Sequence, residues 1–408
     1  MSQQLSSEYL IQLAEQFGTP LYVYHAEKIR EQYDKLQSGF ARCNARFFYA
    51  CKALSNINIL RYVESIGASL DCVSINEVRL GLKAGFPPER ILFTPNCVDF
   101  NEVEEGKNEG VSINIDNISI LEKFGTRFGN SYPICIRFNP HIMGGGNYKI
   151  STGHIDSKFG ISIHQLRHIE RIIKSTNLLV HGIHMHTGSD IKDVNVFLQG
   201  LEVMFDLAVH FPELKFIDLG SGFKVPYKEG DIQTDIEVLG KNVAEAFERY
   251  EKETGKQVEV WFEPGKYLVS ESGYFIVKAN VIKQTTATVF VGVNSGFNHL
   301  IRPMFYESYH HITNLSNNHG SERIYTVVGN ICETDTFAWD RQLNEVREGD
   351  YLVFFNAGAY GFEMSSNFNS RLKPAEVLVK DGKAALIRKR DVFEDLLRNQ
   401  IDLELKAL

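Results

Sequence analysis

The chain has 408 residues, of which 43% are hydrophobic and 23% charged, a composition typical of folded globular proteins and unlike disordered or fibrous chains. Its formal net charge of -8 argues against nucleic acid as a main partner, because phosphate binding normally needs a basic face. A small molecule is therefore the expected partner, and the length favours two domains.

The cysteines and the N-terminus argue against a secreted or membrane protein. The six cysteines form no C-x-x-C pair and no regular spacing, so they predict neither a disulfide framework nor a zinc site. The N-terminus lacks a basic region followed by an apolar core, and no apolar run approaches the roughly 20 residues of a membrane helix. We expect a cytoplasmic protein without a bound metal or a membrane partner.

The first part of the chain alternates β-rich segments with amphipathic helical segments such as 56–68, 75–86, 164–176 and 235–255. Eight such strands over about 220 residues favour a (β/α)8 barrel, which typically has ~250 residues. A doubly wound sheet shows the same alternation, and only the number of strands favours the barrel. The predicted strands are 46–50, 70–73, 90–94, 111–116, 133–139, 178–186, 214–220 and 258–263.

Polar residues stand at or near the ends of these strands. Because the carboxyl ends of barrel strands meet at one mouth, these side chains are expected to face a common cavity. Ordinary polar residues at the start of loops are the alternative explanation for some of them. The residues are Lys52, Asp71, Thr94, Asp116, Arg137 with Asn139, His186, Asp218 and Glu263.

After about residue 270 the pattern changes to β-rich segments without a long helix until 391–400. This predicts a second, mostly antiparallel β-domain. The first 25 residues, which include the strand-like segment 20–25, precede the barrel and are expected to join this domain. The predicted domains are therefore 26–270, and 1–25 together with 271–408.

Three features of the barrel segment suggest a carbonyl cofactor with a phosphate. Lys52, at a strand end inside a cavity, would lose solvation and become a neutral amine able to form a Schiff base. Gly220 and Gly222 would let backbone N–H groups approach a phosphate. Glu263 could pair with a protonated ring nitrogen. The alternatives are a structural lysine at the rim, a plain glycine turn and an ordinary strand end.

Two histidines lie on one face of the sixth predicted strand. His184 and His186 lack a third ligand at a suitable spacing, which makes a metal site poor, whereas one flat imidazole over a cofactor ring is enough. We expect His181 and His184 to be satisfied core histidines. His186, nearest the mouth, is the functional candidate.

The second domain carries a separate group of candidates. Cys332 stands beside Glu333, a pair suited to proton donation or ligand binding, and Tyr360 lies in a glycine-flanked turn. Arg302 and Tyr306, four residues apart, could hold a carboxylate. A buried structural cysteine and a solvated loop are the alternatives.

Seven segments resemble motifs of the fold-type III pyridoxal phosphate decarboxylases, and among these of the diaminopimelate decarboxylases. The resemblance extends from about Phe17 to Val379 and implies an alanine racemase-like fold, with a (β/α)8 barrel followed by a β-domain. It also implies pyridoxal 5'-phosphate as cofactor and an amino-acid substrate. The segments are YACKA, HTGSD, DLGSGF, EPGK, IRPMFYESYHH, CETDTF and GAYGFEMSSNFN, in this order.

The resemblance also implies roles for individual residues. Lys52 would carry the cofactor, His186 would stack on its ring, and Cys332 would protonate the carbon that has lost CO2. In this family the cysteine comes from the partner subunit of a homodimer, so each active site would be shared. The implied cofactor contacts are Lys52, Asp71, His186, Ser189, Gly220, Gly222, Glu263, Gly265 and Tyr360. The implied substrate contacts are Lys266, Arg302, Tyr306, Glu333 and Tyr360.

Two departures from the family pattern concern the substrate. The usual EPGR reads EPGK, so Lys266 replaces an arginine that helps to bind a carboxylate, and an ammonium cannot make the same bidentate contact. The usual CESGD reads CETDT, which changes the loop beside Cys332 and Glu333.

The resemblance implies decarboxylation of meso-2,6-diaminopimelate to L-lysine, the last step of lysine biosynthesis. Carboxynorspermidine, ornithine and lysine are the alternative substrates, although the Arg302 and Tyr306 pair favours a dicarboxylic one. An amino-acid racemase would need a base on each face of the carbanion, whereas Cys332 is a single acid. A non-catalytic pyridoxal phosphate carrier would resemble the barrel alone, and an inactive homologue would tend to lose the lysine. This chain keeps Lys52, Cys332 and the whole second domain.

Overall fold

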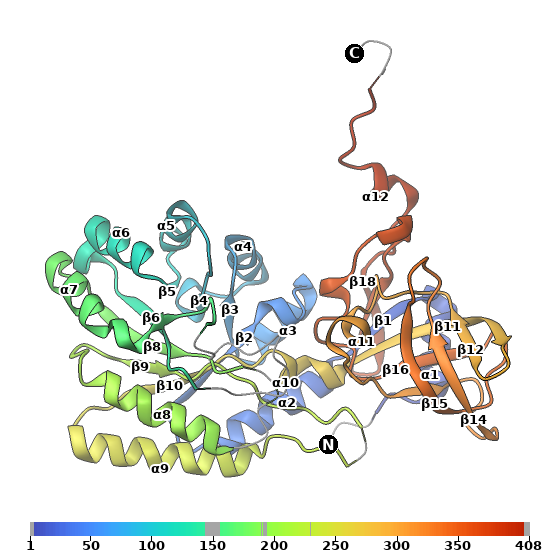
Figure 1. The fold of residues 1–408 in the computed structure, drawn as a ribbon, viewed down its shortest axis with the longest axis horizontal. Helices are drawn as coiled ribbons and strands as arrows, with labels where there is room; N and C mark the ends of the chain where they lie inside the picture. Colours follow the sequence, from blue (N-terminus) through green and yellow to red (C-terminus); the bar gives the residue numbers. More distant parts are fainter. Residues whose placement is uncertain (1–3, 143–155, 189, 191–193, 229, 404–408) are drawn as a thin grey trace. The chain divides into compact units, whose positions relative to one another are not determined.

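The computed structural model describes residues 4–142, 156–188, 190, 194–228 and 230–403 (Figure 1). The chain divides into two compact units, with boundaries after Glu27 and after Glu271. The segment between these boundaries forms the first unit, and the residues before and after it form the second. None of the helices in the described part of the chain has the length and apolarity needed to cross a membrane.

The first unit is a closed eight-stranded parallel barrel, which confirms the predicted fold. Neighbouring strands pair in parallel all the way round, including β10 with β2 and β5 with β6, and the short strand β7 (Ile161–Ser162) adds to β6. All eight predicted strands are present, with ends that differ by one or two residues. They are β2 (Ala45–Ala50), β3 (Ser69–Cys72), β4 (Ile91–Phe93), β5 (Ser112–Ile115), β6 (Ile134–Asn139), β8 (Val180–Met185), β9 (Phe216–Asp218) and β10 (Glu259–Phe262).

Helices connect the strands and lie around the outside of the barrel (Figure 1). Helix α4 illustrates why they form: the side chain of Ser74 caps its N-terminus by accepting a hydrogen bond from the Glu77 N–H, and Gly85 ends it in the left-handed region at φ 110°. The helices are α2 (Ala26–Gly39), α3 (Ile57–Ser65), α4 (Ile75–Ala84), α5 (Phe100–Asn108), α6 (Ile118–Phe128), α7 (Leu166–Thr176), α8 (Val194–Ala208), α9 (Ile236–Thr254) and α10 (Lys266–Val269).

An apolar layer joins five of the eight strands of the barrel, β2, β4, β6, β9 and β10. Phe48, Leu92, Cys135, Phe216 and Trp261 form one buried cluster, in which the rings of Phe216 and Trp261 are stacked. Because strand side chains alternate, the residue two positions further along each strand faces the same side. That next layer is polar on four of these five strands and also on β8. Its polar residues are Thr94, Arg137, His184, Asp218 and Glu263. The polar mouth of the barrel therefore begins directly above this apolar layer, whose aromatic members Phe48, Phe216 and Trp261 are called the aromatic floor below.

The second unit is a mostly antiparallel β-structure, as predicted. Its main sheet has the order β15-β14-β12-β11-β1-β17-β18, and β16 pairs with β11 and β13. Strand β1 lies between β11 and β17, antiparallel to the first and parallel to the second. The strands are β1 (Leu21–His25), β11 (Gly273–Gln284), β12 (Val289–Val293), β13 (Ile312–Asn314), β14 (Glu322–Val328), β15 (Thr336–Asn344), β16 (Tyr351–Phe354), β17 (Ala375–Lys380) and β18 (Lys383–Arg388).

Three helices belong to this second unit: α1 (Ser7–Phe17), α11 (Arg302–Tyr306) and α12 (Phe393–Leu397). The buried side chains of α1 pack with those of β1 and β11 into one apolar core, which includes Leu10, Leu13, Val23 and Ile276. The N-terminal segment is thus held in this unit by sheet pairing and by burial of apolar side chains.

Candidate active site

Lys52 lies at the mouth of the barrel, in the single helical turn Cys51–Ala53 that follows β2. The parallel pairing of β2 with β3 sets Ala50 opposite Asp71, so the two strand ends are neighbours. Nζ of Lys52 is 3.7 Å from Oδ2 of Asp71, and the lysine side chain is 45% exposed whereas the aspartate is 1% exposed. The lysine is therefore accessible to a ligand while a buried carboxyl group holds its amine.

The buried position of Asp71 also changes its acidity. Burial raises the pKa of Asp71 to about 7, and the negative charge of Glu263 adds to this effect, whereas the Lys52 ammonium opposes it. Its second oxygen, Oδ1, is buried without a hydrogen-bond partner. Near neutral pH this carboxyl group is therefore close to the midpoint of its titration.

Glu263 belongs to a buried polar cluster at the carboxyl ends of β8, β9 and β10. Oε2 of Glu263 lies 3.2 Å from Nε2 of His184, and one oxygen or nitrogen atom from each of Glu263, His184 and Asp218 lies within 4.8 Å of the others. Oε1 of Glu263 is buried without a hydrogen-bond partner. Burial raises the pKa of Glu263, against the opposing charges of Lys52 and Arg137. This oxygen is thus ready to accept a hydrogen bond from a ligand.

The expectation for His184 is wrong in one respect. It is a fully buried core residue, as predicted, but neither ring nitrogen makes an aligned hydrogen bond. Burial, reinforced by the positive charges of Arg137 and Lys52, holds the pKa of His184 well below its usual range. The neutral imidazole therefore belongs to the polar layer above the aromatic floor rather than to a satisfied core.

His186 is fixed by the glycine turn that follows β9. The backbone N–H of Ser221 donates to Nδ1 of His186 at 3.2 Å. Burial and the positive charge of Arg137 hold the pKa of His186 well below its usual range, so the ring is neutral near pH 7 and its proton is on Nε2. The structure thus brings together His186, Gly220 and Glu263, three residues that the sequence predicts for cofactor binding.

Gly220 is required at its position by both backbone conformation and space. Its φ is +62°, and a Cβ atom there would lie 2.5 Å from Nδ1 of His186 and 2.8 Å from the carbonyl oxygen of Met185. Its N–H donates to Oδ1 of Asp218 at 2.8 Å, and its carbonyl accepts from the Glu263 N–H at 2.7 Å. This turn therefore ties the ends of β8, β9 and β10 together.

A Gly220→Ala variant is expected to lose cofactor affinity by at least about tenfold, because the new methyl group must displace His186 and the turn. The matched control is Gly255→Ala, which has a similar φ of +69° but nothing within 4 Å of the new Cβ atom. In both variants the left-handed backbone conformation lowers the free energy of unfolding by about 1 to 2 kcal/mol. Titration of the apo-proteins with pyridoxal phosphate distinguishes them, and equal affinities would contradict a role of Gly220 in the site.

Three further barrel residues were predicted to bind the cofactor: Gly222, Gly265 and Ser189. Gly222 has a φ of +125°. Gly265 precedes α10 and packs closely against Ala50 and Ala53. Ser189 lies outside the described residues.

Lys266 forms an ion pair in the structure that the sequence did not predict. Its Nζ is 2.5 Å from Oδ1 of Asp190, and its side chain is only 10% exposed. These two residues are 76 positions apart in the chain. The ammonium group that was predicted to bind a substrate carboxylate therefore already has an anionic partner.

In the second unit, α11 and a glycine turn bring three predicted residues together. Arg302 is buried, and its guanidinium lies 5.7 Å from the ring centre of Tyr306 and 5.8 Å from that of Tyr360. Its Nη2 also donates to the hydroxyl of Ser308 at 3.3 Å. A cation flanked by two tyrosines is well suited to hold a carboxylate.

Cys332 and Glu333 are both exposed, in the loop between β14 and β15. Sγ of Cys332 lies 3.3 Å from Oδ1 of Asn369 and 4.0 Å from Oε1 of Glu333. The same loop is anchored by Asp335, which is buried and accepts a hydrogen bond from the Phe297 N–H at 2.7 Å. Asp335, the aspartate of the altered CETDT segment, thus anchors this loop, in which the thiol of Cys332 stays exposed.

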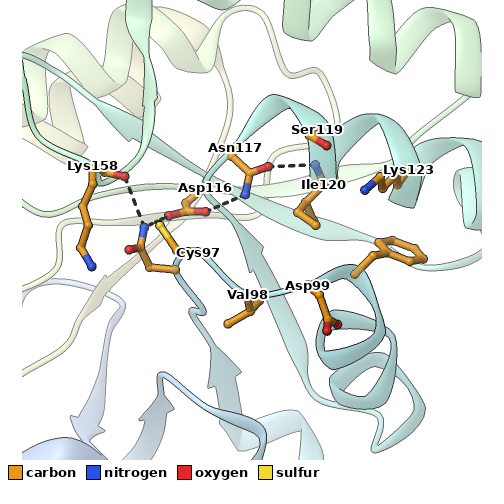
Figure 2. Close-up of a pocket in the computed structure, with 11 residues that line it drawn as sticks. Cys97, Val98, Asp99, Asp116, Asn117, Ser119, Ile120, Lys123 and Lys158 are labelled. Atoms are coloured by element: carbon orange, nitrogen blue, oxygen red, sulfur yellow. Dashed lines mark hydrogen bonds between the residues drawn. The ribbon is translucent and has the colours of Figure 1, made fainter.

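A cavity of about 380 Å³ lies beside the ends of β4 and β5. Figure 2 shows that its polar side chains hydrogen bond to one another. Asp116 accepts from the side-chain amides of Asn96 and Asn117, and Asn117 caps α6 by accepting from the Ile120 N–H. None of the residues predicted for cofactor or substrate binding lines this cavity, so we assign it no part in the reaction.

Arg137, His184 and Asp218 were not predicted as cofactor-binding or substrate-binding residues, although Arg137 and Asp218 were expected near strand ends at the mouth. All three are buried in the polar layer. The sequence signal that could have identified them is the alternation of strand side chains. Each of the three lies two residues beyond a position that faces the barrel interior on β6, β8 or β9.

Comparison with known proteins agrees with this site. Residues 26–270 match the family described as pyridoxal-dependent decarboxylase, pyridoxal binding domain. The chain belongs to the pyridoxal-dependent decarboxylases. Pyridoxal phosphate is therefore its cofactor, and decarboxylation is its class of reaction, as the motifs predicted.

Similarity extends over nearly the whole chain. Diaminopimelate decarboxylase from Methanothermobacter thermautotrophicus is 40% identical over 96% of this chain and 93% of that protein. The Escherichia coli enzyme of the same name is 36% identical over 96% of each chain. The crystal structure of diaminopimelate decarboxylase from Helicobacter pylori with L-lysine has a TM-score of 0.88 at 30% identity, covering 98% of this chain and 100% of that chain. This similarity includes both units of the chain.

Proposed function

We propose that this protein is a pyridoxal phosphate-dependent carboxy-lyase that converts meso-2,6-diaminopimelate into L-lysine and CO2, the last step of lysine biosynthesis. Relatives named diaminopimelate decarboxylase match nearly the full chain at 33% to 40% identity. The observation that carries the proposal on the structural side is Lys52, half-exposed beside a buried carboxyl group at the mouth of the barrel. The predicted cytoplasmic location follows from this biosynthetic role.

The barrel residues fit the cofactor in three places. Lys52 would bind its aldehyde through Nζ, with Asp71 holding the amine in position. Oε1 of Glu263, buried without a partner, would accept a hydrogen bond from the ring nitrogen. His186 would stack on the ring, and the turn at Gly220 and Gly222, with Ser189 and Gly265, would bind the phosphate. When bound, the cofactor withdraws electrons from the carbon that loses CO2.

The second unit would supply the substrate contacts and the proton. Arg302, Tyr306 and Tyr360 would hold a carboxylate of the substrate, and Glu333 would bind the ammonium group at its far end. The thiol of Cys332 would donate the proton that replaces CO2. We further propose that the protein acts as a homodimer with shared active sites, in which each barrel receives Cys332 of the partner subunit.

The ion pair between Lys266 and Asp190 bears directly on the substrate. If Lys266 binds a carboxylate, the substrate competes with Asp190 for the ammonium. Lys266→Ala should then raise KM for meso-diaminopimelate about tenfold, the loss of one charge-assisted hydrogen bond, with the visible spectrum of the bound cofactor unchanged. Asp190→Asn should lower KM, because the competitor is removed. An unchanged KM in both variants would show that this pair does not contact the substrate.

A substrate panel tests the proposed choice of substrate. The catalytic efficiency kcat/KM is measured for meso-diaminopimelate, carboxynorspermidine, ornithine and lysine, with CO2 release as the common readout. We expect meso-diaminopimelate to be preferred by at least about a hundredfold, because Arg302 would lose its carboxylate partner with ornithine or lysine. Preference for carboxynorspermidine would keep the reaction class and replace the substrate. Interconversion of amino-acid enantiomers without CO2 would indicate a racemase.

A further inference from the structure

Asp218 occupies the centre of the buried polar cluster, at the end of β9. Its side chain is completely buried. Oδ1 accepts a hydrogen bond from the Gly220 N–H at 2.8 Å. Oδ2 has no hydrogen-bond partner, and the cluster places Asp218 beside Glu263 and His184, with atoms of all three within 4.8 Å of one another. One side chain thus binds the glycine turn and lies beside the carboxylate assigned to the ring nitrogen.

Two buried carboxyl groups this close cannot both be ionised at low cost. Burial and the negative charge of Glu263 raise the pKa of Asp218 well above its usual range, and Asp71 adds to this, whereas Arg137 and the hydrogen bond from Gly220 oppose it. Burial raises the pKa of Glu263, and the positive charges of Lys52 and Arg137, together with the nearby Asp218 carboxyl group, oppose this rise. His184 has a pKa held well below its usual range by burial, and Lys52 and Arg137 favour the ionised form of Glu263, so a single proton shared by the two carboxyl groups would lie on Asp218.

We propose that Asp218 is a positioning residue that acts as a neutral acid, donating from Oδ2 to Glu263 while its Oδ1 accepts from Gly220. This inference rests on the proposed cofactor contacts of Glu263 and of the glycine turn. Asp218 itself does not touch the cofactor in this proposal. It leaves Glu263 with the negative charge that a protonated ring nitrogen requires.

The same contacts join the cofactor-binding groups into one unit. Asp218 holds Gly220, the Glu263 N–H donates to the Gly220 carbonyl at 2.7 Å, and the next residue, Ser221, donates to His186 at 3.2 Å. The group at the ring nitrogen, the group stacked on the ring and the phosphate turn are therefore all held through the end of β9. Removal of the Asp218 side chain should disturb all of them together.

Asparagine and alanine at this position distinguish a neutral acid from a charged carboxylate. Asp218→Asn keeps one acceptor for Gly220 and one donor for Glu263 without any negative charge. We expect Asp218→Asn to bind pyridoxal phosphate within about threefold of the wild-type affinity, and Asp218→Ala to bind it at least about tenfold more weakly. The visible spectrum should change in Asp218→Ala, because Glu263 and His186 move, and should be retained in Asp218→Asn.

Asp235 provides a matched control for loss of a structural aspartate. It caps α9 by accepting from the Val238 N–H at 3.0 Å, outside the cluster. Asp235→Ala should lower the melting temperature, and Asp235→Asn should keep it, because asparagine also caps helices. Neither should change the visible spectrum or the affinity for the cofactor. A spectral change in Asp218→Ala alone therefore separates positioning from general loss of stability.

Infrared spectroscopy of the apo-protein tests the proton on Asp218 without the cofactor. The difference between wild type and Asp218→Asn should contain the carbonyl stretch of a protonated carboxylic acid near neutral pH. Asp71→Asn serves as a second difference spectrum, because Asp71 also has a raised pKa. Absence of the acid band, or an Asp218→Asn variant as damaged as Asp218→Ala, would overturn the inference. A divalent metal bound by the wild type and lost in Asp218→Asn would overturn it as well.

Failure of this inference is distinguishable from failure of the proposed function. If the wild type binds pyridoxal phosphate and only the variants behave unexpectedly, the role of Asp218 is wrong and the cofactor site stands. If the wild type itself shows no visible band with pyridoxal phosphate, the proposed cofactor contacts are wrong.

Discussion

Lys52→Ala is expected to remove the visible absorption band of the bound cofactor and to lower turnover by more than about 10³-fold. Lys52 lies at the barrel mouth, and its amine is accessible and 3.7 Å from a buried carboxyl group. Its loss removes the covalent attachment of the aldehyde and a group able to transfer protons beside it. Absorption spectra and single-turnover rates measure the two effects separately.

Lys52→Arg provides the matched control for charge. A guanidinium keeps the positive charge next to Asp71, so the ion pair and the fold are retained, but it cannot bind an aldehyde. The arginine variant should therefore be as colourless and as inactive as the alanine variant while keeping the melting temperature of the wild type. A coloured variant of either kind would show that another lysine carries the cofactor.

Cys332→Ala should keep the visible band and lower turnover by about 10²-fold or more, the usual contribution of a general acid. The thiol is exposed in the β14–β15 loop, 3.3 Å from Oδ1 of Asn369, and lies in the second unit rather than in the barrel that holds Lys52. It can therefore be replaced without touching the proposed cofactor contacts. Spectra and CO2 release are measured on the same protein sample.

Cys97→Ala is the matched control for the loss of an exposed free thiol. It lines the cavity beside β4 and β5, which contains none of the proposed site residues, and should leave both colour and turnover unchanged. Full activity of Cys332→Ala would contradict the assignment of the proton donor. Loss of colour would show that Cys332 supports the cofactor instead.

The periodicity of the sequence was sufficient to predict the barrel because every strand carries a local signal. Each of the eight predicted segments has a short β-rich run followed by a polar residue, and each forms a strand within one or two residues of the predicted ends. The positions of Lys52 and Glu263, which directly follow a strand, were predictable for the same reason. The two side chains lie near one another because the carboxyl ends of parallel strands meet at one end of the barrel, and no local sequence pattern indicates a contact between them.

Contacts between distant loops could not be predicted in this way. Lys266 and Asp190 pair through side chains that come together only in the folded barrel, and nothing local to either residue indicates a partner. The same holds for Asp335, whose buried carboxylate anchors the Cys332 loop through Phe297. His184 was misjudged because a strand pattern shows that a residue is buried, not whether its polar atoms have partners.

The central claim is that this chain removes CO2 from meso-diaminopimelate. The direct test is to incubate the purified wild-type protein, loaded with pyridoxal phosphate, with this compound and to quantify both products. We predict one L-lysine for each CO2 released, with no lysine formed by Lys52→Ala. No lysine from the wild type, while the compound still alters the visible spectrum of the bound cofactor, would contradict the proposed substrate and leave the cofactor site intact.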